Sequence, residues 1–175
     1  PVIKYEIISN TNVLDIKENV SRLDILFDSV SVKKSGQNLR VITLKISNEG
    51  NENFNSDFFD SKSPLGFQIE GAKIVQKPEL IGFSNEYIKE TIELTETQSN
   101  KVFFSNIIID QGEYFTIKTL TLSDEGVIPT IKPLGYISGS GVPKLVVINN
   151  ETEVTPKSFF RKLFFGNFGY HVLMS

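Results

Sequence analysis

The sequence predicts an all-β protein built as an antiparallel β-sandwich, and three observations support this. β-branched and aromatic residues are abundant, whereas alanine occurs once among the 175 residues, at Ala72; that composition suits strands. Short runs of alternating apolar and polar residues are separated by Gly, Asn and Pro. No helical period is found before residue 150. A small β-barrel is the alternative, because strand spacing alone does not separate the two architectures.

In the first third of the chain, alternation predicts strands over residues 2–9, 23–32 and 39–47. The third is the clearest, because Ile42, Leu44 and Ile46 alternate with polar residues. The sequence Asn48-Glu49-Gly50-Asn51 follows it directly. Asn and Gly both tolerate positive φ, so we expect a turn here with Gly50 in the left-handed region.

The rest of the chain is predicted to contribute further short strands, over residues 66–70, 73–75, 87–95, 102–109, 114–122 and 130–137. Pro78 predicts an edge strand or a connection, since proline cannot donate a ladder hydrogen bond. Residues 110–113 include Gly112 and predict a hairpin between the strands on either side of them. In the 114–122 strand the apolar residues change parity, which a bulge near Thr119 would explain.

The inward positions of these strands define the predicted core. Residues 1–148 are expected to form the sandwich domain, and residues 149–175 a C-terminal tail with a short amphipathic helix that begins at Thr155-Pro156. The side chains expected between the sheets are Ile42, Leu44, Ile46, Ile92, Leu94, Phe104 and Ile108.

The tail supplies the candidate contact residues, which combine phenylalanines with basic side chains: Lys157, Phe159, Phe160, Arg161, Lys162, Leu163 and Phe164. One interpretation is a terminal helix that packs its Phe residues onto the sandwich. Another is a segment that lies on a membrane surface, with its basic residues on lipid phosphates. A third is a helix that binds a protein partner.

The composition argues against an enzyme. The chain has no Cys and one His, His171, and it lacks phosphate-binding and metal-binding motifs. No cofactor is therefore expected, and the net charge of −3 gives no support to nucleic-acid binding. Carboxylates near turns remain as candidates for glycoside hydrolysis, provided that two of them meet in a cleft; they are Asp57, Asp60, Asp110, Glu113, Asp124 and Glu125.

One stretch of the sequence carries a resemblance to known proteins. The strand over residues 42–47 ends in Asn48-Glu49-Gly50-Asn51 and is followed by Asp57-Phe58, with residues 107–113 and 135–137 at similar spacing. Over about residues 23–137 this pattern resembles immunoglobulin-like β-sandwich domains of uncharacterised bacterial membrane-associated proteins. The resemblance implies an immunoglobulin-like fold and a neighbouring membrane, on a side that it does not specify, and it implies no catalytic residues.

These observations predict a non-catalytic binding or sensing domain, whose partner is a protein or a membrane surface. The alternative is a carbohydrate- or small-ligand-binding module. A carbohydrate platform requires a row of exposed aromatic rings, and the candidates with a polar group are Tyr5, Tyr87, Tyr114, Tyr136 and Tyr170.

Overall fold

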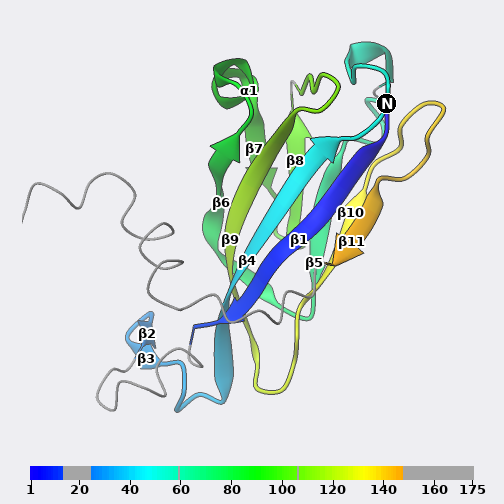
Figure 1. Ribbon diagram of the computed structural model, residues 1–175. Coiled ribbons are helices and arrows are strands. Elements are labelled where there is room, and N and C mark those ends of the chain that lie inside the picture. The colour runs from blue at the N-terminus through cyan, green and yellow to red at the C-terminus, as the bar shows by residue number, and fades with distance from the viewer. Residues whose placement is uncertain (14–24, 59, 106, 148–175) are drawn as a thin grey trace, which may run out of the picture.

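The computed structural model describes residues 1–13, 25–58, 60–105 and 107–147, and it confirms the all-β prediction (Figure 1). A five-stranded sheet has the order β11 (Lys144–Val147), β1 (Ile3–Asn12), β4 (Gln37–Asn48), β9 (Tyr114–Asp124), β6 (Lys73–Phe83). A four-stranded sheet has the order β10 (Thr130–Leu134), β5 (Gly66–Glu70), β8 (Lys101–Ser105), β7 (Glu93–Glu96). Neither sheet closes on itself, so the barrel alternative is wrong.

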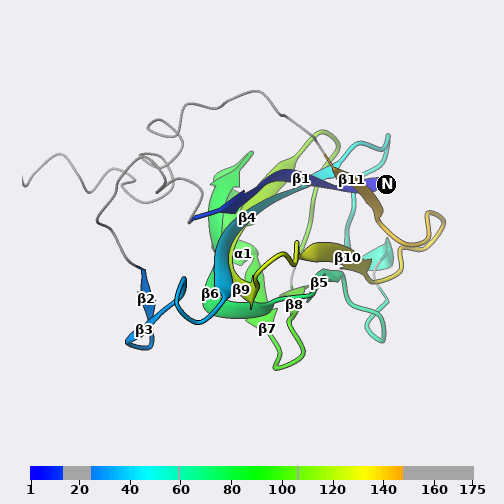
Figure 2. The same ribbon diagram turned by 90° about the horizontal axis from the view of Figure 1, so that it is seen from below.

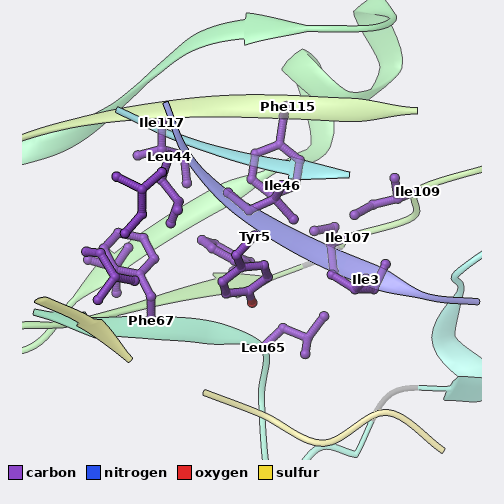
Figure 3. Packing of buried hydrophobic residues seen from close by; sticks show 14 of the residues in the cluster. Ile3, Tyr5, Leu44, Ile46, Leu65, Phe67, Ile107, Ile109, Phe115 and Ile117 are labelled. Atoms are coloured by element: carbon purple, nitrogen blue, oxygen red, sulfur yellow. The ribbon is translucent and has the colours of Figure 1, made fainter. Parts of the chain in front are cut away.

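The two sheets face each other across one apolar core. Figure 2 shows the five-stranded sheet curving over the four-stranded one. Phe104 on β8 joins them, because its ring lies 6.2 Å from the ring of Tyr5 on β1 and 5.3 Å from that of Phe115 on β9, centroid to centroid. Phe67 on β5 lies 6.0 Å from the same ring. Figure 3 shows Tyr5, Phe67 and Phe115 within the surrounding aliphatic side chains.

Most of the predicted core is confirmed. Ile42, Leu44, Ile46 and Phe104 are buried, and Ile92 and Leu94 are half-buried against the core cluster. The prediction for Ile108 is wrong, since its side chain is 37% exposed. Its neighbours Ile107 and Ile109 are buried instead, because Ile109 pairs with Phe54 in an isolated bridge that sets the parity of this segment.

Two predicted strands turn out to contain other elements. Residues 25–32 form a small hairpin of β2 (Leu26–Phe27) and β3 (Val30–Ser31), while residue 23 lies outside the described part of the chain. The 87–95 segment begins as helix α1 (Glu86–Thr91), whose N-cap Asn85 accepts a hydrogen bond from the backbone N–H of Ile88. Ile88 and Ile92 are four residues apart, so their spacing fits a helix as well as a strand.

Strand pairing differs from the prediction in two further places. β8 and β9 lie in different sheets, so residues 110–113 connect the sheets and do not form a hairpin. β11 pairs with β1 in parallel, so the five-stranded sheet is not wholly antiparallel. Pro78 does lie on an edge strand, β6, whose pairing with β9 shifts register between Gln76 and Glu79. A proline at that irregularity interrupts no regular ladder.

The turn after β4 contains a glycine for a reason other than the predicted one. Gly50 does not adopt positive φ. A Cβ at this position would lie 2.8 Å from the carbonyl carbon of Pro1 and would also contact the backbone nitrogen of Val2. Glycine is required here because the N-terminal segment passes against the turn.

The short 3₁₀ helix η2 (Ser56–Phe58) follows, and the predicted C-terminal helix lies outside the described residues.

Candidate functional site

The interior face of the five-stranded sheet changes from apolar to polar along the same strands. On β4, Ile46, Leu44 and Ile42 face the core, and Arg40 and Asn38 continue that face toward the beginning of the strand. We call this region the polar end, and it consists of Asn10, Asn12, Asn38, Arg40, Thr119, Thr121 and Ser123.

Two features of register produce the polar end. The pairing of β1 with β4 shifts between Ile7 and Ser9, so Asn10 lies opposite Ile42 and Asn12 opposite Arg40. A bulge of this kind exchanges the two faces of a strand. β9 pairs with β4 without any shift, and where its pairing with β6 shifts around Thr119 the extra residue lies on β6, so the bulge predicted in β9 is wrong. Thr119 therefore lies on the inward face, opposite Ile42.

The outer face shows the reverse pattern at the same level of the sheet. Leu39 and Val41 are buried there, although they do not belong to the main core. Leu120 and Leu122, which lie opposite them on β9, are half-buried. Apolar and polar residues thus still alternate along these strands beyond the core. Here, however, the apolar residues occupy the outer face and the polar residues occupy the inward face.

Arg40 is the one charged residue of the polar end. Its Nη1 donates hydrogen bonds to the backbone oxygen of Asn10 at 3.1 Å and to Asn10 Oδ1 at 3.3 Å. Its Nε is buried and has no hydrogen-bond partner. Among the described residues, the ion pairs join other side chains and none includes Arg40. A guanidinium that is partly withdrawn from water usually has a carboxylate beside it.

The neighbouring polar groups hydrogen-bond to an adjacent connection. Asn10 Nδ2 donates to the backbone oxygen of Pro129 at 3.2 Å, and Ser123 Oγ donates to that of Val127, also at 3.2 Å. Both acceptors belong to the connection from β9 to β10, which therefore passes beside the polar end. The Thr119 hydroxyl is buried without a partner. The polar end thus contains two buried groups without a hydrogen-bond partner, Arg40 Nε and the Thr119 hydroxyl.

None of the described candidate residues predicted from the sequence is a member of the polar end. Lys157, Phe159, Phe160, Arg161, Lys162, Leu163 and Phe164 lie outside the described residues, as do His171 and Tyr170. Asp57 and Asp60 belong to the connection from β4 to β5, Asp110 and Glu113 to that from β8 to β9, and Asp124 and Glu125 follow one another at the end of β9.

One of these carboxylates has a structural role. Glu113 accepts hydrogen bonds from the backbone N–H of Asp110 and from Asn85 Nδ2, so it ties its own turn to the cap of α1. In the described part of the chain, no group of three or more His, Cys, Asp or Glu side chains is arranged to hold a metal ion.

The tyrosines are also dispersed. Tyr5 is buried in the core, and this burial raises the pKa of its phenol. Tyr114 lies beneath the ammonium of Lys45, which is 4.6 Å from the ring centroid. Tyr87 and Tyr136 are exposed, but Tyr87 belongs to α1 and Tyr136 to the connection from β10 to β11, and these lie on opposite sides of the molecule (Figure 1).

No family model matches the chain, and neither the curated proteins nor the solved structures contain a match. Across the described ranges, no helix has both the length and the apolar character that crossing a bilayer demands.

The polar end is not among the sites predicted from the sequence, although part of its signal is present there. Asn38 and Arg40 have the same parity as Ile42, Leu44 and Ile46 in the clearest strand of the chain. Polar side chains at inward positions are the informative exception in an alternating strand. The contributions of Asn10 and Asn12 were not visible, because they depend on the bulge in β1.

Proposed function

We propose that this chain is a non-catalytic binding or sensing domain, an immunoglobulin-like β-sandwich from a bacterial membrane-associated protein. The observation that carries the proposal is the polar end, where Arg40 has a buried, unpartnered Nε and no ion pair within the described residues. A buried donor without a partner calls for an explanation, and an acceptor that binds to it is one.

Membrane association is the second part of this proposal, and it depends on the sequence of the tail. On a helix, Phe160, Leu163 and Phe164 share one face, while Arg161 points away from it. Each basic residue near anionic lipid contributes about 1 kcal/mol of binding free energy, and inserted Phe side chains add to this. A protein partner that accepts the same apolar face is the competing occupant.

Vesicle co-sedimentation of the full chain tests the membrane contact. We expect the protein to sediment with vesicles that contain phosphatidylserine and to remain in solution with phosphatidylcholine alone. The double variant Phe160→Ser, Phe164→Ser should lose the binding, because it removes the inserted apolar side chains. Ile128→Ser is the matched control, since Ile128 is an exposed apolar residue of the folded part.

Two outcomes would reject the membrane role. One is that the double variant sediments as the unaltered protein does. The other is that neither protein binds either vesicle, while removal of residues 155–175 lowers the thermal stability. That second result would mean that the Phe side chains pack onto the folded domain.

A further inference from the structure

We infer that the polar end is an oxyanion-binding site, in which Arg40 holds a carboxylate or phosphate group of a small ligand. The inference rests on the proposed binding function and names the class of ligand. It concerns residues of β1, β4 and β9 and does not involve the tail.

The hydrogen bonds of Arg40 leave one edge of its guanidinium available. Both side-chain bonds are donated by Nη1, and both go to Asn10. The Nε–H and the adjacent Nη2 then form the other edge, which is the side-on arrangement of two parallel donors. Two oxygens of a carboxylate or a phosphate match this edge, because guanidinium recognises such groups in a bidentate manner.

Burial adds an energetic reason. Nε has no hydrogen-bond partner and is withdrawn from solvent. A charged donor in this position loses its hydration without a replacement, unless an acceptor binds to it. Thr119 is 2% exposed and its hydroxyl also has no partner. It lies on the inward face, two residues from Thr121, the cross-strand neighbour of Arg40. An oxyanion bound in the polar end would give both groups, the Arg40 Nε–H and the Thr119 hydroxyl, the hydrogen-bond acceptor that they lack.

The polar end meets solvent at three half-buried residues. Thr119, Thr121 and Ser123 are buried, whereas Arg40, Asn10 and Asn38 are half-buried and so form a boundary with solvent. Because Nε itself is withdrawn from solvent, a ligand has to approach the guanidinium edge from that boundary. The net charge of −3 gives no general attraction for anions, so binding has to come from these local donors.

Nuclear magnetic resonance on the full chain tests this directly, because the Nε–H group of Arg40 gives its own signal. We would titrate the protein with sodium glucuronate and with sodium phosphate, using glucose and sodium chloride as controls. The expected result is a saturable shift of the Arg40 Nε–H signal with at least one of the two oxyanions and with neither control. A response to glucuronate alone identifies a carboxylate site, and a response to phosphate alone identifies a phosphate site.

Variants separate the site from general charge effects. Arg40→Gln should weaken anion binding at least tenfold, as followed by backbone amide shifts, and Thr119→Val should weaken it several-fold. Lys132→Gln removes an exposed positive charge from β10 and should leave the affinity unchanged. Arg40→Lys keeps the positive charge but loses the paired N–H donors, so we expect it to bind the anion less tightly. It keeps the test valid if the Arg40→Gln variant does not fold.

The inference is overturned if no oxyanion shifts the Arg40 signal, or if Arg40→Gln, Arg40→Lys and Thr119→Val all retain full affinity. Failure here leaves the proposed function separately testable. If the full chain still sediments with anionic vesicles, the proposed binding function is retained and only the oxyanion site is rejected. If neither assay shows binding, both are rejected.

Discussion

Asn48 secures the end of β4 with its side chain as well as its backbone. Its Nδ2 donates to the backbone oxygen of Glu52 at 2.7 Å and to that of Ile109 at 3.0 Å. Its Oδ1 accepts from the backbone N–H of Val2 at 3.2 Å and of Gly50 at 3.0 Å. The side chain is fully buried, so each of these bonds replaces one to water. Asn48 thereby holds three separate segments against the end of β4.

Replacing Asn48 with Asp tests this role. The new carboxyl keeps the acceptors but loses both amide donors, so it faces two carbonyl oxygens that it cannot satisfy when ionised. We expect a destabilisation of about 3 kcal/mol at pH 7, from buried groups left unsatisfied. The folded state favours the protonated form, so the pKa of the introduced carboxyl lies above the unfolded value of about 3.9. The destabilisation should therefore grow as the pH rises through the interval between the unfolded and folded pKa values.

Urea denaturation at pH 4 and at pH 7 measures this effect. Asn51→Asp is the control, because Asn51 is exposed in the same turn, and it should change the free energy of unfolding little at either pH. A loss for Asn48→Asp that is small, or larger at pH 4 than at pH 7, would contradict the role that we assign to the side chain.

At the scale of elements, the turn of the β2–β3 hairpin has a backbone conformation that its sequence does not favour. Its two turn residues, Asp28 and Ser29, have φ of 49° and 66°. This is the left-handed geometry that a two-residue hairpin turn needs, and Asn-Gly, Asp-Gly or Gly-Gly normally supplies it. Asp28 suits the first position, but Ser29 stands where glycine is favoured, so the turn carries a conformational cost at Ser29.

Ser29→Gly should lower that cost and stabilise the hairpin by about 0.5–1 kcal/mol. Hydrogen exchange is the suitable measurement, because the backbone N–H of Val32 donates to the oxygen of Ile25 across the base of the hairpin. We expect slower exchange of the Val32 amide in the variant. Ser61→Gly is the matched control, since Ser61 is exposed and does not have positive φ. Equal or faster exchange in Ser29→Gly would show that the turn is not strained.

Prediction from sequence succeeded for elements whose alternation is regular and local. β4 and β5 lie close to their predicted bounds, and Pro78 marks an edge strand as expected. It failed where a tertiary contact decides the outcome. The bulge in β1 and the unbroken register of β9 result from pairing with β4, a partner distant in sequence. The polar end depends on both, so parity along single strands could not reveal it.

At the scale of the whole molecule, the core between the sheets carries the stability. Leu44 is 1% exposed on the central strand β4, between Ile7 of β1 and Ile117 of β9. Leu44→Ala removes buried methyl groups and leaves a cavity, so we expect a loss of about 2–5 kcal/mol in the free energy of unfolding. Chemical denaturation followed by circular dichroism measures it.

Leu26→Ala serves as the comparison for this substitution, because Leu26 is an exposed leucine on β2. It should change the free energy of unfolding by less than about 0.5 kcal/mol. A Leu44→Ala variant as stable as Leu26→Ala would mean that the two sheets do not share the core described above.

The assignment of strands to sheets was the global feature that the sequence did not reveal. β8 and β9 are consecutive strands joined by a short segment, which locally resembles a hairpin. They separate because Ile109 pairs with Phe54 and the backbone N–H of Gly112 donates to the oxygen of Asn48. Both partners come from the end of β4 and its turn, so the chain is directed from one sheet to the other by a contact outside the segment itself.

The parallel pairing of β1 with β11 also affects how the chain folds as it is synthesised. β1 is made first and can pair with β4 early, but its other edge is completed only by the last described strand. At 5–20 residues per second, that edge waits on the order of ten seconds on the ribosome. An unpaired strand edge recruits strands from other chains. Crowded polysomes should therefore be the setting in which this protein aggregates most readily, and a slower elongation rate should increase that loss.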